Sequence, residues 1–135
     1  MNSEQTSDPD EDMTPCARYQ DHTPEVLIVD DDLRVADILQ QLLEDEGFVV
    51  AHEGDGRSAL THIERKKPDV VLADMKMPRL GGVGLLREIT NRWGDIDVIL
   101  MSASESPVGL TVPFLQKPFD LEDVLNTICN YPGYT

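Results

Sequence analysis

Basic side chains are scarce in this chain of 135 residues, which has 26 aspartates and glutamates against 11 lysines and arginines and a formal net charge of -15. A surface that binds nucleic acid needs lysine and arginine to neutralise phosphates, and so does a surface that docks on anionic lipid. The charge balance therefore argues against both kinds of partner.

Long hydrophobic runs are also missing. The unbroken apolar runs are only a few residues long, whereas a membrane-spanning helix needs roughly 20 apolar residues. The first residues, MNSEQTSDPDEDMTPC, are acidic and lack the apolar segment of a secretory signal. We therefore predict a cytoplasmic protein with no membrane partner.

Cysteine is rare, since only Cys16 and Cys129 occur, too few for a disulfide framework. In a cytosolic setting we expect both thiols to be reduced, with Cys16 lacking a partner and Cys129 in the core. Residues 1–24 hold six acids, one base and almost no large aliphatic side chains. Such a stretch cannot offset its ordering entropy, so we predict a flexible acidic tail over 1–24 and one domain over 25–135.

Five short apolar runs follow this tail, and they are rich in β-branched residues and do not alternate with polar ones. They are Val26–Val29, Phe48–Ala51, Val70–Ala73, Val98–Met101 and the weaker Phe114–Leu115. Such runs are typical of parallel strands that are buried on both faces. Amphipathic helical patterns over 33–46, 57–66, 83–93 and 121–129 lie between or after them. The order predicts an α/β fold with a doubly wound five-stranded parallel sheet.

The connection between the last two strands is short, because fourteen residues separate Ser102 from Lys117 and the final strand takes some of them. A crossover helix with its two loops normally needs about a dozen residues or more. Pro107 is tolerated only in a first turn, Gly109 weakens a helix and Pro113 ends one. We predict that the fourth helix, between these strands, has one turn at most or is missing.

Polar side chains follow four of the predicted strands, at the points where the strands end. They are Asp30, Asp31, Asp32, Asp74, Ser102 and Lys117. The carboxyl ends of parallel strands share one edge of the sheet, which is where open α/β sheets bind ligands. The pattern therefore predicts one shallow site, and it leaves Asp32 with the alternative role of capping the first helix.

The chemistry of this predicted site favours a cation and a phosphoryl group. Crowded carboxylates repel one another unless a cation joins them, and hard oxygen ligands suit Mg²⁺. The metal and the Lys117 ammonium would neutralise phosphoryl oxygens, while Ser102 could donate a hydrogen bond. One carboxylate could act as the nucleophile and form an acyl phosphate.

Four motifs carry a family resemblance. They are Val29-Asp30-Asp31, Asp74-x-x-Met77-Pro78 with Gly82 following, Ser102-Ala103, and Phe114-x-x-Lys117-Pro118. Together, in this order over residues 26 to about 130, they resemble the receiver domain of two-component response regulators, which implies a flavodoxin-like receiver fold. Because the chain ends 18 residues after Lys117, we expect a stand-alone, single-domain response regulator.

The resemblance implies a role for each matching residue. Asp74 is implied as the phospho-acceptor and a magnesium ligand, and Asp31 as a direct magnesium ligand. Asp30 is implied to act through water or by shaping the site. The backbone carbonyl of Lys76 is implied as the third protein ligand of the metal.

The remaining implied roles concern phosphoryl contact and switching. Lys117 is implied to contact the phosphoryl group, and Ser102 to swing toward it and hydrogen-bond it. Phe114 is implied as the switch aromatic that follows Ser102, with plain core packing as its alternative. The implied phosphodonor is a histidine kinase or a phosphotransfer protein, and the implied output is an unidentified protein target.

Three functions remain open at this point. The first is a phosphorelay switch that modifies itself and turns over no metabolite. The second is a hydrolase of the aspartyl-phosphate type, which usually needs an aspartate two residues after the nucleophile, where this chain has Lys76. The third is an interaction module independent of phosphate, against which the complete set of site residues argues.

Overall fold

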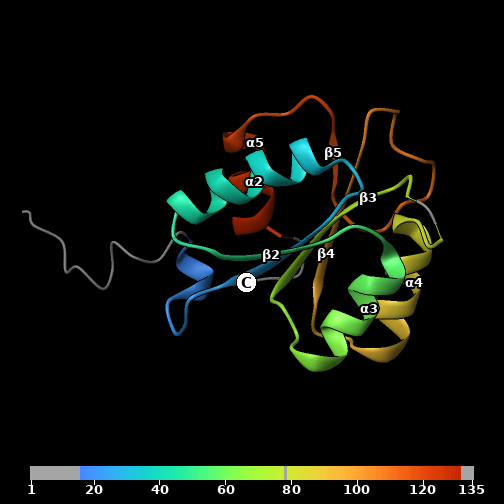
Figure 1. Ribbon diagram of the computed structural model, residues 1–135. Coiled ribbons are helices and arrows are strands. Elements are labelled where there is room, and N and C mark those ends of the chain that lie inside the picture. Colours follow the sequence, from blue (N-terminus) through green and yellow to red (C-terminus); the bar gives the residue numbers. More distant parts are fainter. Residues whose placement is uncertain (1–15, 78, 132–135) are drawn as a thin grey trace, which may run out of the picture.

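The computed structural model describes residues 16–77 and 79–131, which form a sheet with helices on both faces (Figure 1). The strands are β1 (Glu25–Val29), β2 (Val49–Glu53), β3 (Val70–Asp74), β4 (Asp97–Ser102) and β5 (Phe114–Gln116). The α-helices are α2 (Leu33–Asp45), α3 (Gly56–Arg65), α4 (Gly82–Arg92) and α5 (Leu121–Cys129), and a short 3-10 helix, η1 (Ala17–Tyr19), precedes β1.

The strands are all parallel and lie in the order β2-β1-β3-β4-β5. Helices α2 and α5 cover one face of the sheet, and α3 and α4 cover the other (Figure 1). The order reverses direction after β2, as right-handed crossovers on both faces require. The predicted doubly wound five-stranded parallel sheet is therefore confirmed.

Both faces of the central strands are buried, which explains their unbroken apolar runs. In β1, Val26 and Ile28 pack toward α2 and α5, whereas Leu27 and Val29 pack toward α3 and α4. These four side chains are at most 1% exposed. Alternate residues of a strand point to opposite faces, so a strand between two helical layers needs apolar side chains at every position.

Aspartates cap α2 and α5, and the cap at Asp32 is the alternative role that the sequence left open. The Asp32 side chain accepts hydrogen bonds from the backbone of Arg34 and Val35 at the start of α2. Asp120 and Asp123 form a reciprocal capping box at the start of α5. Each cap satisfies backbone N–H groups that the first turn of a helix leaves without a partner.

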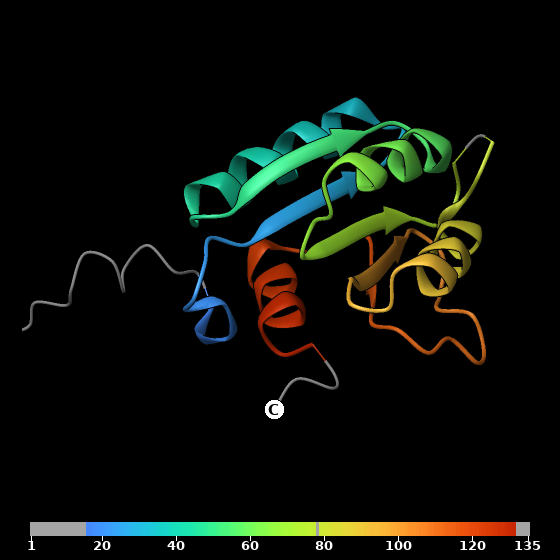
Figure 2. The same cartoon turned by 90° about the horizontal axis from the view of Figure 1, so that it is seen from below.

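The connection between β4 and β5, residues 103–113, contains no helix (Figure 2). The prediction of one turn at most is confirmed, and the fourth α-helix along the chain, α5, follows β5. Val108 is fully exposed, but Leu110 and Val112 pack against the apolar cluster on the α3 and α4 face. The connection therefore covers part of the face that a crossover helix would otherwise bury.

Part of the predicted tail is folded, so the prediction of flexibility over 1–24 is wrong for residues 16–24, which we call the N-terminal segment. Cys16 and Tyr19 are only 5% and 4% exposed and belong to the core beneath α2 and α5. Arg18 forms an ion pair with Asp97 of β4. The composition of the segment hid these contacts because two side chains suffice to anchor it. Residues 1–15 lie outside the described residues.

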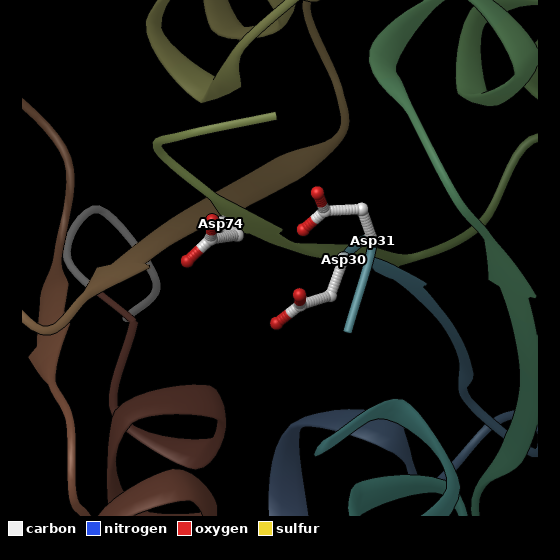
Figure 3. A group of neighbouring side chains, drawn as sticks. All are labelled: Asp30, Asp31 and Asp74. Carbon is white, nitrogen blue, oxygen red and sulfur yellow. The ribbon is translucent and has the colours of Figure 1, made fainter. Parts of the chain in front are cut away.

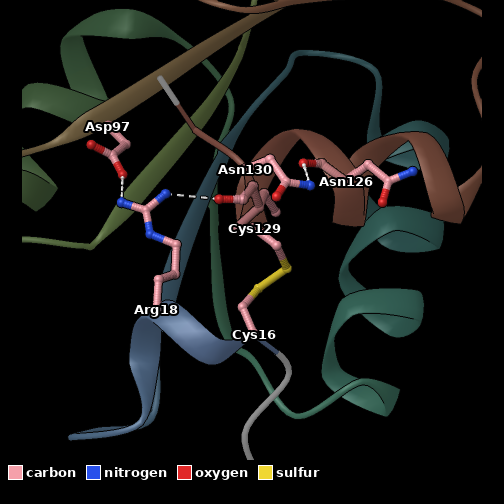
Figure 4. Close-up of a disulfide and its surroundings, with 7 residues drawn as sticks. Cys16, Arg18, Asp97, Asn126, Cys129 and Asn130 are labelled. Atoms are coloured by element: carbon pink, nitrogen blue, oxygen red, sulfur yellow. Dashed lines mark hydrogen bonds and ion pairs between the residues drawn. A yellow bond between two sulfur atoms is a disulfide. The ribbon is translucent and has the colours of Figure 1, made fainter. Parts of the chain in front are cut away.

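The prediction of two reduced thiols is wrong, because Cys16 and Cys129 form a disulfide (Figure 4). Their Cα atoms lie 5.3 Å apart although 113 positions separate them in the chain. Only the docking of the N-terminal segment beside the end of α5 brings them together. No helix among residues 16–77 and 79–131 is long and apolar enough to span a membrane.

His22 holds the other end of the N-terminal segment. Its Nε2 lies 2.9 Å from a carboxylate oxygen of Asp69, and its Nδ1 lies 2.7 Å from Asp21. These hydrogen bonds, that to Asp69 first, raise the pKa of His22 above its ordinary value. The protonated His22 therefore stabilises the folded state. This stabilisation is fully present at pH values below the pKa of the unfolded state, and it is lost as pH rises through the higher pKa of the folded state.

We predict that replacing His22 with glutamine lowers the melting temperature at about pH 5.5 and that this loss becomes smaller toward about pH 8.5, because the stabilisation by the protonated imidazole is lost as pH rises through the raised pKa. Thermal unfolding of both proteins across this range measures the difference. A difference of equal size at both ends of the range would show that the charge of His22 does not hold the segment.

Candidate functional site

Three carboxylates gather at the carboxyl edge of the sheet. Asp30 and Asp31 directly follow β1, and Asp74 ends β3. Val29 pairs with Ala73 across these neighbouring strands, so Asp30 is level with Asp74. One carboxylate oxygen from each of the three residues lies within 4.8 Å of the other two (Figure 3). Asp30 and Asp74 are 1% and 8% exposed, whereas Asp31 is open to solvent.

Lys117 is the cation of this site. Its Nζ donates to Asp30 Oδ2 and to Asp74 Oδ1, at 3.0 Å in both cases. Its backbone N–H donates to the carbonyl of Ser102 at 2.7 Å, which holds the end of β5 beside the end of β4. Burial on its own lowers the pKa of Lys117, but the two carboxylates outweigh it and raise the pKa. The ammonium is therefore charged at neutral pH and offsets part of the negative charge.

The other oxygens of the buried carboxylates are held by backbone N–H groups. Asp30 Oδ1 accepts from Asp32 at 2.9 Å, and Asp74 Oδ2 accepts from Lys76 at 3.1 Å. Each buried carboxylate thus has one donor on each oxygen, so its orientation is set before any ligand binds. An ionised carboxylate can accept about four hydrogen bonds, so lone pairs remain available for a metal or an electrophile.

His52 supports the site from β2 and was missed by the sequence analysis. Its Nε2 lies 2.8 Å from the backbone carbonyl of Asp30. A carbonyl only accepts, so Nε2 carries the proton and donates. His52 pairs with Ile28 across β1 and β2, two residues before Asp30. Only the register of these strands reveals this contact, because nothing local in the sequence links the two residues.

Ser102 and Phe114 lie at different depths along the last two strands. Ser102 ends β4, is 4% exposed, and its Oγ accepts from the backbone of Ser104 at 3.1 Å. Phe114 begins β5 opposite Leu100 and packs against the cluster on the α3 and α4 face. The structure therefore places Ser102 at the edge with the carboxylates and Phe114 two strand positions below it.

Lys76 lies two residues after Asp74, and its side chain is exposed. Its Nζ is 3.4 Å from the hydroxyl of Ser104, in the connection that follows β4. This contact links the residue that holds Asp74 to the start of the 103–113 connection.

The donor set fits a hard divalent cation. Three carboxylate oxygens converge from two strands, and Asp31 leaves one side of the cluster open to water. Mg²⁺ prefers oxygen ligands and keeps several waters, so it suits a site with few protein ligands and solvent on one side. Repulsion between the carboxylates gives this cluster a further reason to bind a cation.

Known proteins are similar to this chain in sequence and in fold. Residues 26–129 match the family model of the response regulator receiver domain. The response regulator MprA of Mycolicibacterium vanbaalenii is 36% identical over 107 residues, a match that covers 74% of this chain and 46% of that protein. The chain thus spans about half the length of this curated relative.

Solved structures of response regulators are also similar to this chain. The chemotaxis response regulator CheY4 of Vibrio cholerae superposes with a TM-score of 0.72 at 28% identity, covering 78% of this chain and 96% of that one. The response regulator TrrA of Thermotoga maritima, solved in complex with Mg²⁺ and BeF, superposes with a TM-score of 0.73 at 22% identity, which is a likeness of fold. The chain therefore belongs to the response regulator family, with a receiver domain over residues 26–129.

Proposed function

We propose that this receiver domain accepts a phosphoryl group on Asp74, in a Mg²⁺-dependent reaction in the cytoplasm, from a histidine kinase or a phosphotransfer protein. The modified domain then binds a downstream protein target. The observation that carries the proposal is the bridge from Lys117 to both Asp30 and Asp74, beside the exposed Asp31. That arrangement combines a buried nucleophile, a cation and an open acidic face in one place.

We assign the acceptor role to Asp74 because the receiver motif places it there, and because Asp74 is 8% exposed whereas the other buried carboxylate, Asp30, is 1% exposed. One of its oxygens attacks the phosphorus of the donor and forms a P–O bond. The bond from phosphorus to the donor histidine nitrogen breaks, and the nitrogen keeps the electron pair. The product is an acyl phosphate on Asp74.

Charge at the reacting group is balanced from two sides. Asp30, Asp31, Asp74 and the backbone carbonyl of Lys76 would hold Mg²⁺, which when bound would supply positive charge to offset the negative phosphoryl oxygens. Lys117 supplies a second positive charge from the end of β5. Asp30 is held in place by the N–H of Asp32 and lies 3.0 Å from Lys117, so it also orients the ammonium.

The signal leaves the site through Ser102 and the connection after it. The Ser102 hydroxyl turns toward the phosphoryl oxygens and gives up the hydrogen bond from the backbone of Ser104. The 103–113 connection then shifts, and Phe114 at its end moves with it as the switch aromatic. Because this connection has no helix, the target reads a change in a loop rather than in a helical face.

The domain modifies itself and turns over no metabolite. An aspartyl-phosphate hydrolase would use an acid two residues after its nucleophile, and this chain has the exposed Lys76 there.

We predict that Asp74→Asn abolishes phosphate uptake from acetyl phosphate and Mg²⁺, because an amide is a poor nucleophile. Intact mass spectrometry would show one added phosphoryl group on the wild type and none on the variant. Asp95→Asn is the matched control, since Asp95 is exposed and pairs with Lys67 away from the site. Phosphate on the Asp74→Asn protein would place the acceptor elsewhere.

We predict that Lys117→Met lowers the free energy of unfolding by about 2 kcal/mol in EDTA, since it leaves two buried carboxylates without their cation. Saturating Mg²⁺ should recover part of this loss by replacing the missing charge. Asp31→Ala, which removes an exposed carboxylate, should change stability in EDTA by less than about 0.5 kcal/mol. Urea unfolding measures all three proteins, and a larger loss for Asp31→Ala than for Lys117→Met would contradict this account of the charges.

A further inference from the structure

The loop that follows Asp74 is described at residues 75–77 and 79–81, which we call the acceptor loop, and a backbone hydrogen bond closes its base. The N–H of Gly82 donates to the carbonyl of Met75 at 3.2 Å. A Cβ atom on Gly82 would lie 2.7 Å from the carbonyl oxygen of Asp74, and one on Gly81 would lie 2.6 Å from that of Met75. These close approaches leave the base of the loop one packing arrangement.

The C-terminal part of the acceptor loop, at Leu80, contacts the start of α3. The N–H of Gly56, the first residue of α3, donates to the carbonyl of Leu80 at 3.2 Å. A Cβ atom on Gly56 would lie 2.4 Å from that carbonyl oxygen and 2.8 Å from the Leu80 Cβ. Any side chain at position 56 therefore pushes the backbone of the loop away from α3.

An ion pair strengthens the same contact. Arg79 has a φ of 70°, which is uncommon outside glycine, and its guanidinium pairs with Asp55. Asp55 is 7% exposed and caps α3 by accepting from the N–H of Ser58 at 2.8 Å. One carboxylate thus fixes both the start of the helix and the tip of the loop.

The acceptor loop contacts α3 through Leu80 and contacts Asp74 through Lys76, and these two residues are close in sequence. Leu80 lies only four residues after Lys76, whose N–H holds Asp74 Oδ2 at 3.1 Å. We propose that Gly56, together with Asp55, is a positioning site for phosphoryl acceptance. It presses the acceptor loop into the place where Lys76 orients Asp74 and presents its carbonyl to the metal. This inference rests on the proposed function.

The test is Mg²⁺ binding by the unphosphorylated full chain, measured by isothermal titration calorimetry. Gly56→Ala should raise the dissociation constant about tenfold, as loss of an outer contact to a metal site does. Gly84→Ala is the matched control, because its Cβ would meet only the flexible end of the same Leu80, at 2.6 Å from Cδ1. Gly94→Ala is a second control, because its Cβ would meet nothing within 4 Å. Both controls should bind Mg²⁺ like the wild type.

A second variant tests the ion pair without a steric clash. Arg79→Gly removes the guanidinium and introduces a residue that adopts positive φ easily. It should weaken Mg²⁺ binding about threefold, because an exposed ion pair contributes little. Arg92→Ala is its control, since it also breaks an ion pair between α4 and α3, that with Glu64, away from the loop. Wild-type affinity in both Gly56→Ala and Arg79→Gly would overturn the positioning role. Absence of Mg²⁺ binding by the wild type would instead overturn the proposed function.

The disulfide carries a second, independent inference. Three residues, Cys16, Arg18 and His22, attach the N-terminal segment to the amino edge of the sheet, opposite the acceptor site. Cys16 is bonded to Cys129, the last residue of α5, and Arg18 donates to the carbonyl of Ile128 at 2.8 Å and pairs with Asp97 (Figure 4). His22 reaches Asp69, just before β3.

Among these contacts only the disulfide is covalent, and it lies where a reductant can reach it. Cys16 is 5% exposed, but Cys129 is half-buried at the end of α5. The noncovalent contacts include the buried Tyr19, the Arg18 guanidinium over the Tyr19 and Tyr131 rings, and the surface contact of His22. The disulfide adds a covalent link to these contacts, so its reduction should weaken the attachment of the segment.

We infer that the Cys16–Cys129 bond is a reversible redox clasp on the N-terminal segment. A dithiol reductant attacks the sulfur of Cys129, and the S–S bond breaks. Two electrons pass from the reductant to the cysteines, two protons complete their thiols, and the reductant leaves as a disulfide. The released segment uncovers Arg18 and the end of α5. The acceptor site lies at the other edge of the sheet and keeps its geometry.

Limited trypsin digestion of the oxidised and reduced full chain tests the clasp. Arg18 is the first lysine or arginine of the chain, so cleavage after it detaches residues 1–18 once the disulfide is reduced. Its side chain is 9% exposed in the docked segment. Dithiothreitol should speed this cleavage about tenfold, because opening of the segment limits access. Cleavage after the exposed Lys76 and phosphate uptake from acetyl phosphate should not change.

The double variant Cys16→Ser with Cys129→Ser separates the clasp from other effects of the reductant. It should be cleaved after Arg18 at the fast rate with or without dithiothreitol. Two alkylatable thiols in the air-oxidised wild type would overturn the inference. So would equal protection of Arg18 in the oxidised, reduced and double-variant proteins.

Discussion

The bridge from one ammonium to two buried carboxylates is the constraint on which the rest of this structure depends. Asp30 is 1% exposed, and a charge buried to that degree is costly unless it is paired and hydrogen-bonded. Lys117 provides the pairing at 3.0 Å, and the N–H of Asp32 provides the second bond. For Lys117 to reach Asp30, β5, β4, β3 and β1 must lie in parallel with their carboxyl ends level. The pairing of charges at the site therefore requires this topology of the sheet.

The two edges of the sheet do different work. At the carboxyl edge, backbone contacts such as that of Gly56 with Leu80 fix a loop beside the carboxylates. At the amino edge, Cys16 and Tyr19 of the N-terminal segment are buried in the core. Under the two inferences above, a change at the amino edge alters protection of the segment and leaves the carboxylates in place, because closely packed layers separate the two edges.

In the function that we propose, the connection between β4 and β5 carries the signal away from the site. It begins at Ser102, which ends β4 at the site edge, and leads to Phe114 at the start of β5. Leu110 and Val112 attach it to the α3 and α4 face without a helix. A loop held by a few apolar contacts shifts more easily than a packed helix, so a small movement at Ser102 can be passed along it.

The sequence alone determined the strands and which strand-end residues meet at one edge, because each depends on local pattern or on one general rule. Unbroken β-branched runs indicate strands buried on both faces, Asp32 caps the helix that follows it, and parallel strands place their terminal residues at one edge. Tertiary structure alone decided the contacts between distant segments. The bond from Cys16 to Cys129 spans 113 positions, and the support of Asp30 by His52 depends on the register of β1 with β2. Local composition marked residues 16–24 as a tail, since pairing of such distant residues is set only when the whole sheet and its helices have packed.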